Sequence, residues 1–298
     1  MHLPLKGIIP PLVTPLKSYQ ELDIPGLENL IEHQLSGGVH ALFILGTSGE
    51  GPSLSIPLKK EFISLCCGLV NSKIPILVGI SDPSMAASLE LADYAKEAGA
   101  DAVVVAPPYY FPLSEKELLH YLESLVPKLA LPFLLYNIPS HTKIDLSLEV
   151  VKRAKELGAL GIKDSSGDLP HLFALLKEFK NAPDFSIFTG IEKDLPETIQ
   201  QGGHGAVAGG ANMFPKLFVE LYEAAEDQDL ERISRLREKV LWLYQTIYQV
   251  GKDASRYLQG TKCVLSLMGI CKDYMAPPLQ RLDPAKRRQI EEYMEKII

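Results

Sequence analysis

One lysine in the sequence stands where its amine can act as a nucleophile. Lys163 directly follows the short apolar run at residues 160–162. An ammonium group held inward at the end of an apolar strand is partly desolvated, which lowers the pKa of the amine and leaves part of it neutral. A neutral amine forms a Schiff base with a carbonyl substrate, and the iminium accepts electrons while an adjacent C–C bond breaks or forms. The alternatives are a lysine that reaches out to solvent or one that pairs with Asp164.

A tyrosine and a polar loop follow two other apolar runs and fit the same chemistry. Tyr136 ends the run at 133–136, and a phenol near an imine can move the proton that this reaction requires. Thr47 and Ser48 lie in the loop Gly-Thr-Ser-Gly-Glu at 46–50, whose backbone N–H groups would form a nest for a substrate carboxylate. The alternatives are a core aromatic residue at 136 and a tight turn at 46–50.

Short apolar runs alternate with longer amphipathic segments along most of the chain. The runs lack the polar–apolar alternation of half-exposed strands, so we predict strands buried on both faces. They lie at 7–13, 41–45, 74–79, 102–106, 133–136, 160–162, 185–189 and 205–208. Helices are predicted between them, at 25–35, 84–98, 146–157, 170–179, 194–201 and 215–225, and from Ser114 onward. Ser114 with Glu117 forms a capping box, and Asp82-Pro83 is the predicted start of the helix at 84–98.

Eight strands that alternate with helices predict a (β/α)8 TIM barrel, in which the strand ends that carry these polar residues face one active site. The rival is an open, doubly wound sheet, but its G-x-G-x-x-G fingerprint is absent. After residue 225 the strand signals stop, and helical periodicity covers 230–248, 253–268 and 284–298. We therefore predict a barrel domain at 1–226 and a C-terminal three-helix extension at 227–298.

Composition limits the classes of partner. The chain has 298 residues, 46% of them apolar, and a formal net charge of −7. No excess of Lys and Arg is present to neutralise phosphates, which argues against nucleic acid and anionic membranes as partners. No stretch approaches the roughly 18 apolar residues of a membrane-spanning helix, and prolines interrupt the N-terminal segment where a signal peptide needs an apolar core. With no zinc-type Cys/His spacing either, we expect a cytoplasmic protein without a metal site.

Three motifs, in this order along the chain, resemble the dihydrodipicolinate synthase / N-acetylneuraminate lyase family of pyruvate-dependent class I aldolases. The loop at 46–50 is similar to the family's G-T-T-G-E or G-S-T-G-E loop, Tyr-Asn-Ile-Pro at 136–139 to its Y-N-x-P, and Gly-Ile-Lys-Asp at 161–164 to its G-x-K-[DE]. The resemblance implies that Lys163 forms the imine with pyruvate or a 2-oxo acid and that Tyr136 shuttles the proton. It also implies that Thr47 and Ser48 bind the pyruvate carboxylate, with the Val207 carbonyl nearby.

The family resemblance also carries expectations about assembly and cofactors. Tyr110 would reach across a dimer interface and complete a Tyr–Thr–Tyr proton relay in the neighbouring subunit. The family is usually a homotetramer, built as a dimer of dimers, and its members need neither a metal nor an organic cofactor. The expected partners are therefore small-molecule substrates and further copies of this chain.

Departures from the family pattern bear on the second substrate. Synthases carry an arginine two residues after the proline of Y-N-x-P, where this chain has His141. A neutral imidazole cannot make the bidentate contact of a guanidinium with the carboxylate of aspartate semialdehyde, although a protonated one still pairs with an anion. Ile56 and Lys59 stand where many synthases place histidines of a lysine-feedback site. Dihydrodipicolinate synthase activity is therefore the second choice.

Sugar-acid aldolases of the family bind hydroxyl groups at other positions. Ser165 stands where sialic acid lyases have a threonine and Glu192 where they have an aspartate, but Lys193 replaces their second acidic residue. The segment 109–115 resembles 2-keto-3-deoxygluconate aldolases. We therefore expect reversible cleavage of a 2-keto-3-deoxy sugar acid to pyruvate and an aldehyde, followed by the synthase and then by N-acetylneuraminate lyase. A dehydratase and a non-catalytic 2-oxo acid binding protein are the remaining alternatives.

Overall fold

Eight parallel strands close into a ring. The computed structural model describes residues 3–296, and the strands follow the order β1-β10-β9-β8-β7-β6-β5-β4. Their bounds are β1 (Gly7–Ile8), β4 (Leu42–Ile44), β5 (Ile76–Gly79), β6 (Ala102–Val105), β7 (Phe133–Asn137), β8 (Gly161–Asp164), β9 (Ser186–Thr189) and β10 (Gly205–Ala206). The ring closes beside β4, where the Phe43 N–H donates to the Pro10 carbonyl (3.0 Å) and the Leu12 N–H donates to the Phe43 carbonyl (2.8 Å).

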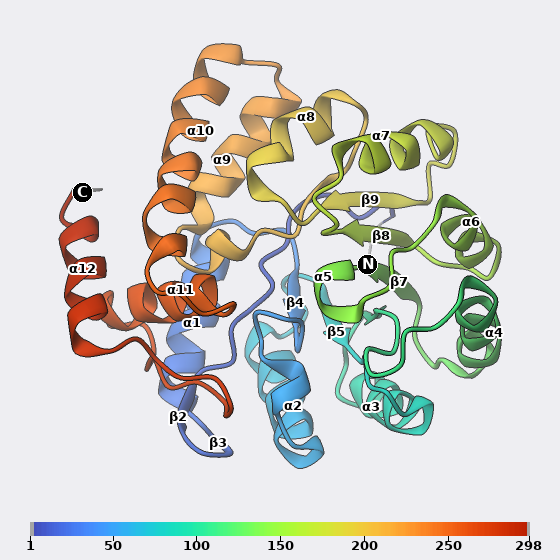
Figure 1. Ribbon diagram of the computed structural model, residues 1–298, viewed down its shortest axis with the longest axis horizontal. Helices are drawn as coiled ribbons and strands as arrows, with labels where there is room; N and C mark the ends of the chain where they lie inside the picture. The colour runs from blue at the N-terminus through green and yellow to red at the C-terminus, as the bar shows by residue number, and fades with distance from the viewer. Residues whose placement is uncertain (1–2, 297–298) are drawn as a thin grey trace.

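Helices surround this ring on its outer side (Figure 1). They are α1 (Ile24–Ser36), α2 (Ile56–Val70), α3 (Met85–Glu97), α4 (Glu115–Leu125), α6 (Leu148–Glu156), α7 (Leu169–Glu178), α8 (Leu195–Gln200) and α9 (Pro215–Glu226), with a short helix α5 (Pro139–Thr142) after β7. The prediction of a TIM barrel is confirmed, and the open sheet is excluded because the strands close into a ring.

Local sequence explains most of the helix starts. The capping box of Ser114 and Glu117 is present at α4. At α3 the predicted cap is wrong: Ser84 is the N-cap and accepts from the Ala87 N–H, while Asp82 accepts from the Ser84 N–H (2.9 Å) and Pro83 lies outside the helix. Neither the helix α2 nor the hairpin of β2 (Leu16–Ser18) and β3 (Glu21–Leu22) was predicted from the sequence.

Two apolar layers hold the barrel. The outer layer fills the space between strands and helices. The inner layer occupies the barrel itself and consists of small, branched and aromatic side chains, including Ile9, Phe43, Leu77, Val104 and Phe188, with Tyr136 at its edge. Because side chains of a strand alternate between the two layers, every second residue of a strand faces the barrel interior. This alternation decides which polar side chains can reach the active site.

Three helices follow the barrel, α10 (Leu230–Gln245), α11 (Arg256–Leu267) and α12 (Pro284–Met294). They lie together on one side of the ring, with α12 farthest from its centre (Figure 1). The apolar residues that recur along 230–248 form a stripe that is buried throughout: Ile233, Leu236, Val240, Leu243 and Ile247, the last of which falls in a 3-10 turn. Because α10 packs directly on α9, the domain boundary near residue 227 stays a prediction. No helix within residues 3–296 is long and apolar enough to cross a membrane.

Candidate active site

Strand register places the lysine and the tyrosine side by side. Tyr136 of β7 is paired with Lys163 of β8, and both side chains face the barrel interior. The Lys163 Nζ lies 4.0 Å from the centre of the Tyr136 ring and 5.3 Å from that of Phe43. A side chain at Gly190 would collide with Ser165 and would make a tight contact with the Lys163 Cε, so the glycine leaves room beside the lysine.

The surroundings of Lys163 favour a neutral amine. Its side chain is 6% exposed, and burial lowers the pKa of Lys163 to about 7, with the carboxylate of Glu192 acting in the opposite direction. The predicted alternative of a solvent-reaching lysine is therefore wrong. Pairing with Asp164 is wrong as well, because Asp164 accepts from Asn137 Nδ2 (2.8 Å) and from Ser166 Oγ (2.9 Å) on the other face of the strand.

Glu192 is the buried acid of the site. Its carboxylate accepts from the Gly210 N–H and from the Tyr248 hydroxyl (3.2 Å), and burial raises the pKa of Glu192 to about 7. The side chain is thus committed to two donors while it lines the same cavity as Lys163. Within residues 3–296, no group of three or more His, Cys, Asp or Glu side chains is arranged to hold a metal ion.

The loop after β4 brings two hydroxyl groups to the lysine. The Thr47 Oγ1 lies 3.3 Å from the Tyr136 hydroxyl, and the Ser48 Oγ lies 3.3 Å from the Tyr257 hydroxyl. Burial raises the pKa of Tyr136 to about 12, so its phenol is protonated at neutral pH. Among residues 3–296, no protein acceptor takes the backbone N–H groups of Thr47 or Ser48. The loop has the free donors that a carboxylate nest requires.

A buried ion pair anchors this loop to the C-terminal helices. The Glu50 carboxylate accepts from the ammonium of Lys262 on α11 and from the Ala276 N–H (2.6 Å). Lys262 also donates to the Tyr274 carbonyl (2.8 Å), and both side chains of the pair are fully buried. The pair therefore ties the loop to α11 and to the segment that follows it.

Lys163, Tyr136 and Glu192 line one cavity of about 330 Å³ at the carboxyl ends of the strands. It is lined by most of the predicted site residues: Thr47, Ser48, Tyr136, His141, Lys163, Ser165, Glu192 and Val207. Tyr110 is the exception. Its side chain is 76% exposed and stacks edge-on against Phe111, outside this cavity.

The C-terminal helices supply part of the cavity wall that was not predicted from the sequence. Tyr244, Tyr248, Gln249, Arg256 and Tyr257 all line it. The periodicity of 230–248 identified the apolar face of that helix, but it gave no sign of where the polar ends of its tyrosines lie. The spacing of Tyr244 and Tyr248, four residues apart beside the apolar stripe, was the one usable signal.

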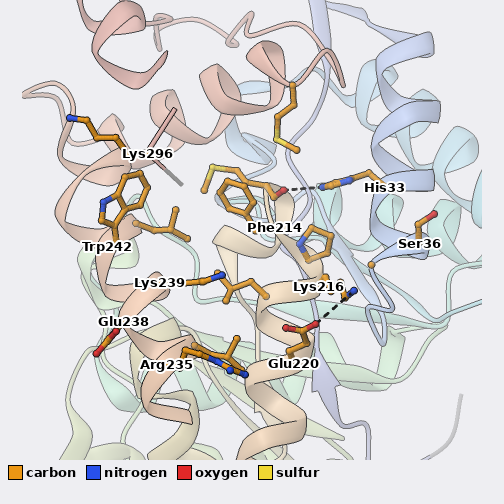
Figure 2. Close-up of a pocket in the computed structure, with 17 residues that line it drawn as sticks. His33, Ser36, Phe214, Lys216, Glu220, Arg235, Glu238, Lys239, Trp242 and Lys296 are labelled. Carbon is orange, nitrogen blue, oxygen red and sulfur yellow. Dashed lines mark hydrogen bonds and ion pairs between the residues drawn. The ribbon is translucent and has the colours of Figure 1, made fainter. Parts of the chain in front are cut away.

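A larger hollow of about 810 Å³ lies outside the barrel, between α9 and α10 (Figure 2). Trp242, Phe214, Lys239 and Arg235 are among its lining residues, and an ion pair of Lys216 with Glu220 (3.9 Å) lies at its edge. None of the predicted site residues lines it. Size alone therefore does not locate the chemistry, because the reactive groups converge in the smaller cavity.

Comparisons with known proteins agree with this architecture. The model of the Dihydrodipicolinate synthetase family matches residues 4–297. The chain is 30% identical to the putative 2-dehydro-3-deoxy-D-gluconate aldolase YagE of Escherichia coli (strain K12), over 98% of this chain and 96% of that protein. It is 32% identical to a 4-hydroxy-tetrahydrodipicolinate synthase of Hyphomonas neptunium, over 97% of each chain.

Solved structures show the same likeness. The dihydrodipicolinate synthase from Bacteroides thetaiotaomicron has a TM-score of 0.96 and 47% identity, with 99% of this chain and 100% of that chain covered. YagE in complex with pyruvate has a TM-score of 0.92 and 30% identity, with 99% of each chain covered. The protein is a TIM-barrel lyase or synthase with a lysine in its central cavity. It belongs to the dihydrodipicolinate synthetase family, as the sequence motifs predicted.

Proposed function

We propose that the protein is a class I aldolase in which Lys163 forms a Schiff base with pyruvate or another 2-oxo acid. The observation that carries the proposal is the buried, partly neutral amine of Lys163, held 4.0 Å from the centre of the Tyr136 ring in the cavity. A neutral amine and a protonated phenol are the nucleophile and the proton donor that imine formation needs. Family membership supports the same reaction class.

In the proposed reaction, the Lys163 amine adds to the keto carbon of pyruvate and water leaves, which gives an iminium. Loss of a methyl proton converts the iminium to an enamine, whose carbon attacks the aldehyde carbonyl and forms the new C–C bond. The aldehyde oxygen takes up a proton, and water then hydrolyses the imine to release a 4-hydroxy-2-oxo acid and the free amine. The cleavage direction runs through the same steps in reverse.

The surrounding groups support specific roles in these steps. Tyr136, with Thr47 at 3.3 Å, moves the protons of the keto and aldehyde oxygens. Ser48, Thr47 and their free N–H groups bind the pyruvate carboxylate, beside the buried Val207. Tyr110, exposed on this chain, extends the relay in a second copy of a homotetramer. We further propose that the enzyme acts in the cytoplasm on small molecules alone.

For the second substrate, we propose a 2-keto-3-deoxy sugar acid, cleaved to pyruvate and an aldehyde. Ser165 and Glu192 line the cavity and offer hydrogen-bond partners for hydroxyl groups. Burial and the charges of Lys143 and Lys163 lower the pKa of His141, so its imidazole is neutral at neutral pH and pairs poorly with a carboxylate. The competing candidate is a dihydrodipicolinate synthase, favoured by the 47% identity to the Bacteroides thetaiotaomicron protein of that name.

Borohydride trapping with pyruvate tests the Schiff base directly. The expected result is a reduced adduct of one pyruvate per chain, found by intact mass and located on Lys163 by peptide mapping. A panel of 4-hydroxy-2-oxo acids, with pyruvate release as the readout, then separates an aldolase from a dehydratase, which releases none. A folded protein that gives no adduct would move the non-catalytic binding protein to first place.

The pH dependence of trapping reports the state of the amine. Because the pKa of Lys163 is about 7 rather than the ordinary 10.5, its neutral fraction rises up to about pH 8 and is then nearly complete. The initial trapping rate with cyanoborohydride is therefore expected to increase through about pH 7 and to level off above it. A rate that still climbs steeply between about pH 9 and 10 would show an ordinary lysine and contradict the proposed state of the amine.

A further inference from the structure

A guanidinium without a partner lines the candidate active site. Arg256 is the first residue of α11, and its side chain is partly buried in the wall of the cavity that contains Lys163. Within residues 3–296 its guanidinium forms no ion pair and donates no hydrogen bond to a protein acceptor. The nearby carboxylate of Asp253 accepts from Gln259 Nε2 (3.3 Å). The five N–H donors of Arg256 are therefore free for a ligand.

The helix that carries Arg256 is fixed relative to the rest of the site. The next residue, Tyr257, places its hydroxyl 3.3 Å from Ser48 Oγ, and Lys262, five residues further, pairs with Glu50 in the same loop. Arg256 directly precedes Tyr257 and, among the described residues, forms no hydrogen bond or ion pair with the loop at 46–50. The backbone of Arg256 is thus held by the contacts of its neighbours, while its guanidinium lines the cavity without a protein partner in the part of the chain that the structure describes.

Arg256 is also the one arginine among the described residues that line this cavity. The pKa of Lys163 and that of Glu192 both lie near 7, because burial disfavours the charged form of each. Burial also lowers the pKa of His141, which leaves its ring neutral. A guanidinium keeps its charge at any physiological pH and presents a planar fork that fits carboxylate and phosphate oxygens.

We propose that Arg256 binds an anionic group at the far end of the substrate, so that the aldehyde partner carries a terminal carboxylate or phosphate. This inference rests on the proposed function, in which the loop at 46–50 already holds the carboxylate of pyruvate. The second anion then needs its own cation, and Arg256 supplies it from α11. The 2-oxo acid that the enzyme makes or cleaves accordingly carries two anionic groups, one at each end.

Imine trapping with matched pairs of 2-oxo acids tests the proposal and does not require the natural aldehyde. One pair is 2-oxoadipate and 2-oxohexanoate, which differ in a terminal carboxylate. The other is 2-keto-3-deoxy-6-phosphogluconate and 2-keto-3-deoxygluconate, which differ in a phosphate. For each compound we would measure the concentration that gives half-maximal borohydride trapping, with pyruvate as the reference.

The native protein is expected to require about 10- to 100-fold less of the anionic member of at least one pair, and Arg256→Ala to lose that difference. The pair that responds identifies carboxylate or phosphate. Arg256→Lys is expected to keep part of the preference, because it retains the charge but not the fork. Arg288→Ala, which removes an exposed arginine of α12, is the control and is expected to keep the full preference.

Two results would overturn the proposal. One is a native protein that traps both members of each pair equally well. The other is an Arg256→Ala variant that loses pyruvate trapping by the same factor as trapping of the compounds with a second anionic group, since Arg256 would then hold the carboxylate that all these compounds share. Failure of the native protein to trap pyruvate at all would instead refute the Schiff-base function on which the proposal rests.

Discussion

Replacing Lys163 with methionine is expected to abolish the pyruvate adduct and to reduce turnover by at least about a thousandfold, because no other amine in the cavity can take over the covalent step. Methionine has nearly the length of lysine and no charge. The site around Nζ is lined by the rings of Tyr136 and Phe43, which accept an apolar group. The variant is therefore expected to fold and to be at least as stable as the native protein, since a desolvated amine has been removed.

The measurements are intact mass after borohydride reduction, turnover with the active aldehyde, and thermal unfolding. Lys193→Met is the matched control, because this lysine follows Glu192 directly but is exposed. It is expected to keep the adduct and to change turnover only slightly. An adduct of unchanged yield on Lys163→Met would place the nucleophile elsewhere and refute the mechanism, whatever the activity of the control.

Candidate site residues that lie at the end of a strand could be located from the sequence alone. The apolar runs predicted the strands, and the end of a buried parallel strand is where a barrel places its reactive side chains. Lys163 and Tyr136 were therefore placed at strand ends from the sequence, and their pairing in register on neighbouring strands makes them adjacent, while their catalytic roles stay proposals. His141, Ser165 and Val207 follow other strand ends and reach the same cavity for the same reason.

Contacts between distant segments were not accessible in this way. Ser48 meets Tyr257 across 209 residues of sequence, and Glu50 meets Lys262 across 212. Periodicity identifies the face of a helix that is buried, but not the element against which a polar residue on that face packs. Lys262 lies in an otherwise well-buried helix, and the sequence around it does not indicate that Glu50 is its partner. Tyr110 differs from all these residues, because its predicted role depends on a second copy of the chain.

Removing the ammonium of the buried pair is expected to cause the largest loss of stability. Lys262→Met would leave the Glu50 carboxylate buried with only the Ala276 N–H as a donor. Breaking a buried ion pair on one side costs about 3–5 kcal/mol, because an uncompensated charge remains away from water. The expected result is a decrease of this size in the free energy of unfolding, measured by urea denaturation at neutral pH. Lys60→Met, which breaks an exposed pair with Glu90, is expected to cost at most about 1 kcal/mol.

A double variant separates the effect of the unpaired charge on stability from the effect of the lost contact on the position of the loop. In Lys262→Met/Glu50→Gln both charges are gone, so much of the lost stability is expected to return, and a double-mutant cycle then gives the coupling between the two residues. The loop is nevertheless no longer tied to α11, and the nest formed by Thr47 and Ser48 shifts relative to Lys163. We therefore expect the double variant to bind pyruvate more weakly in trapping while the yield at saturation recovers. Equal stability of the single variant Lys262→Met and the native protein would show that the pair does not hold the loop.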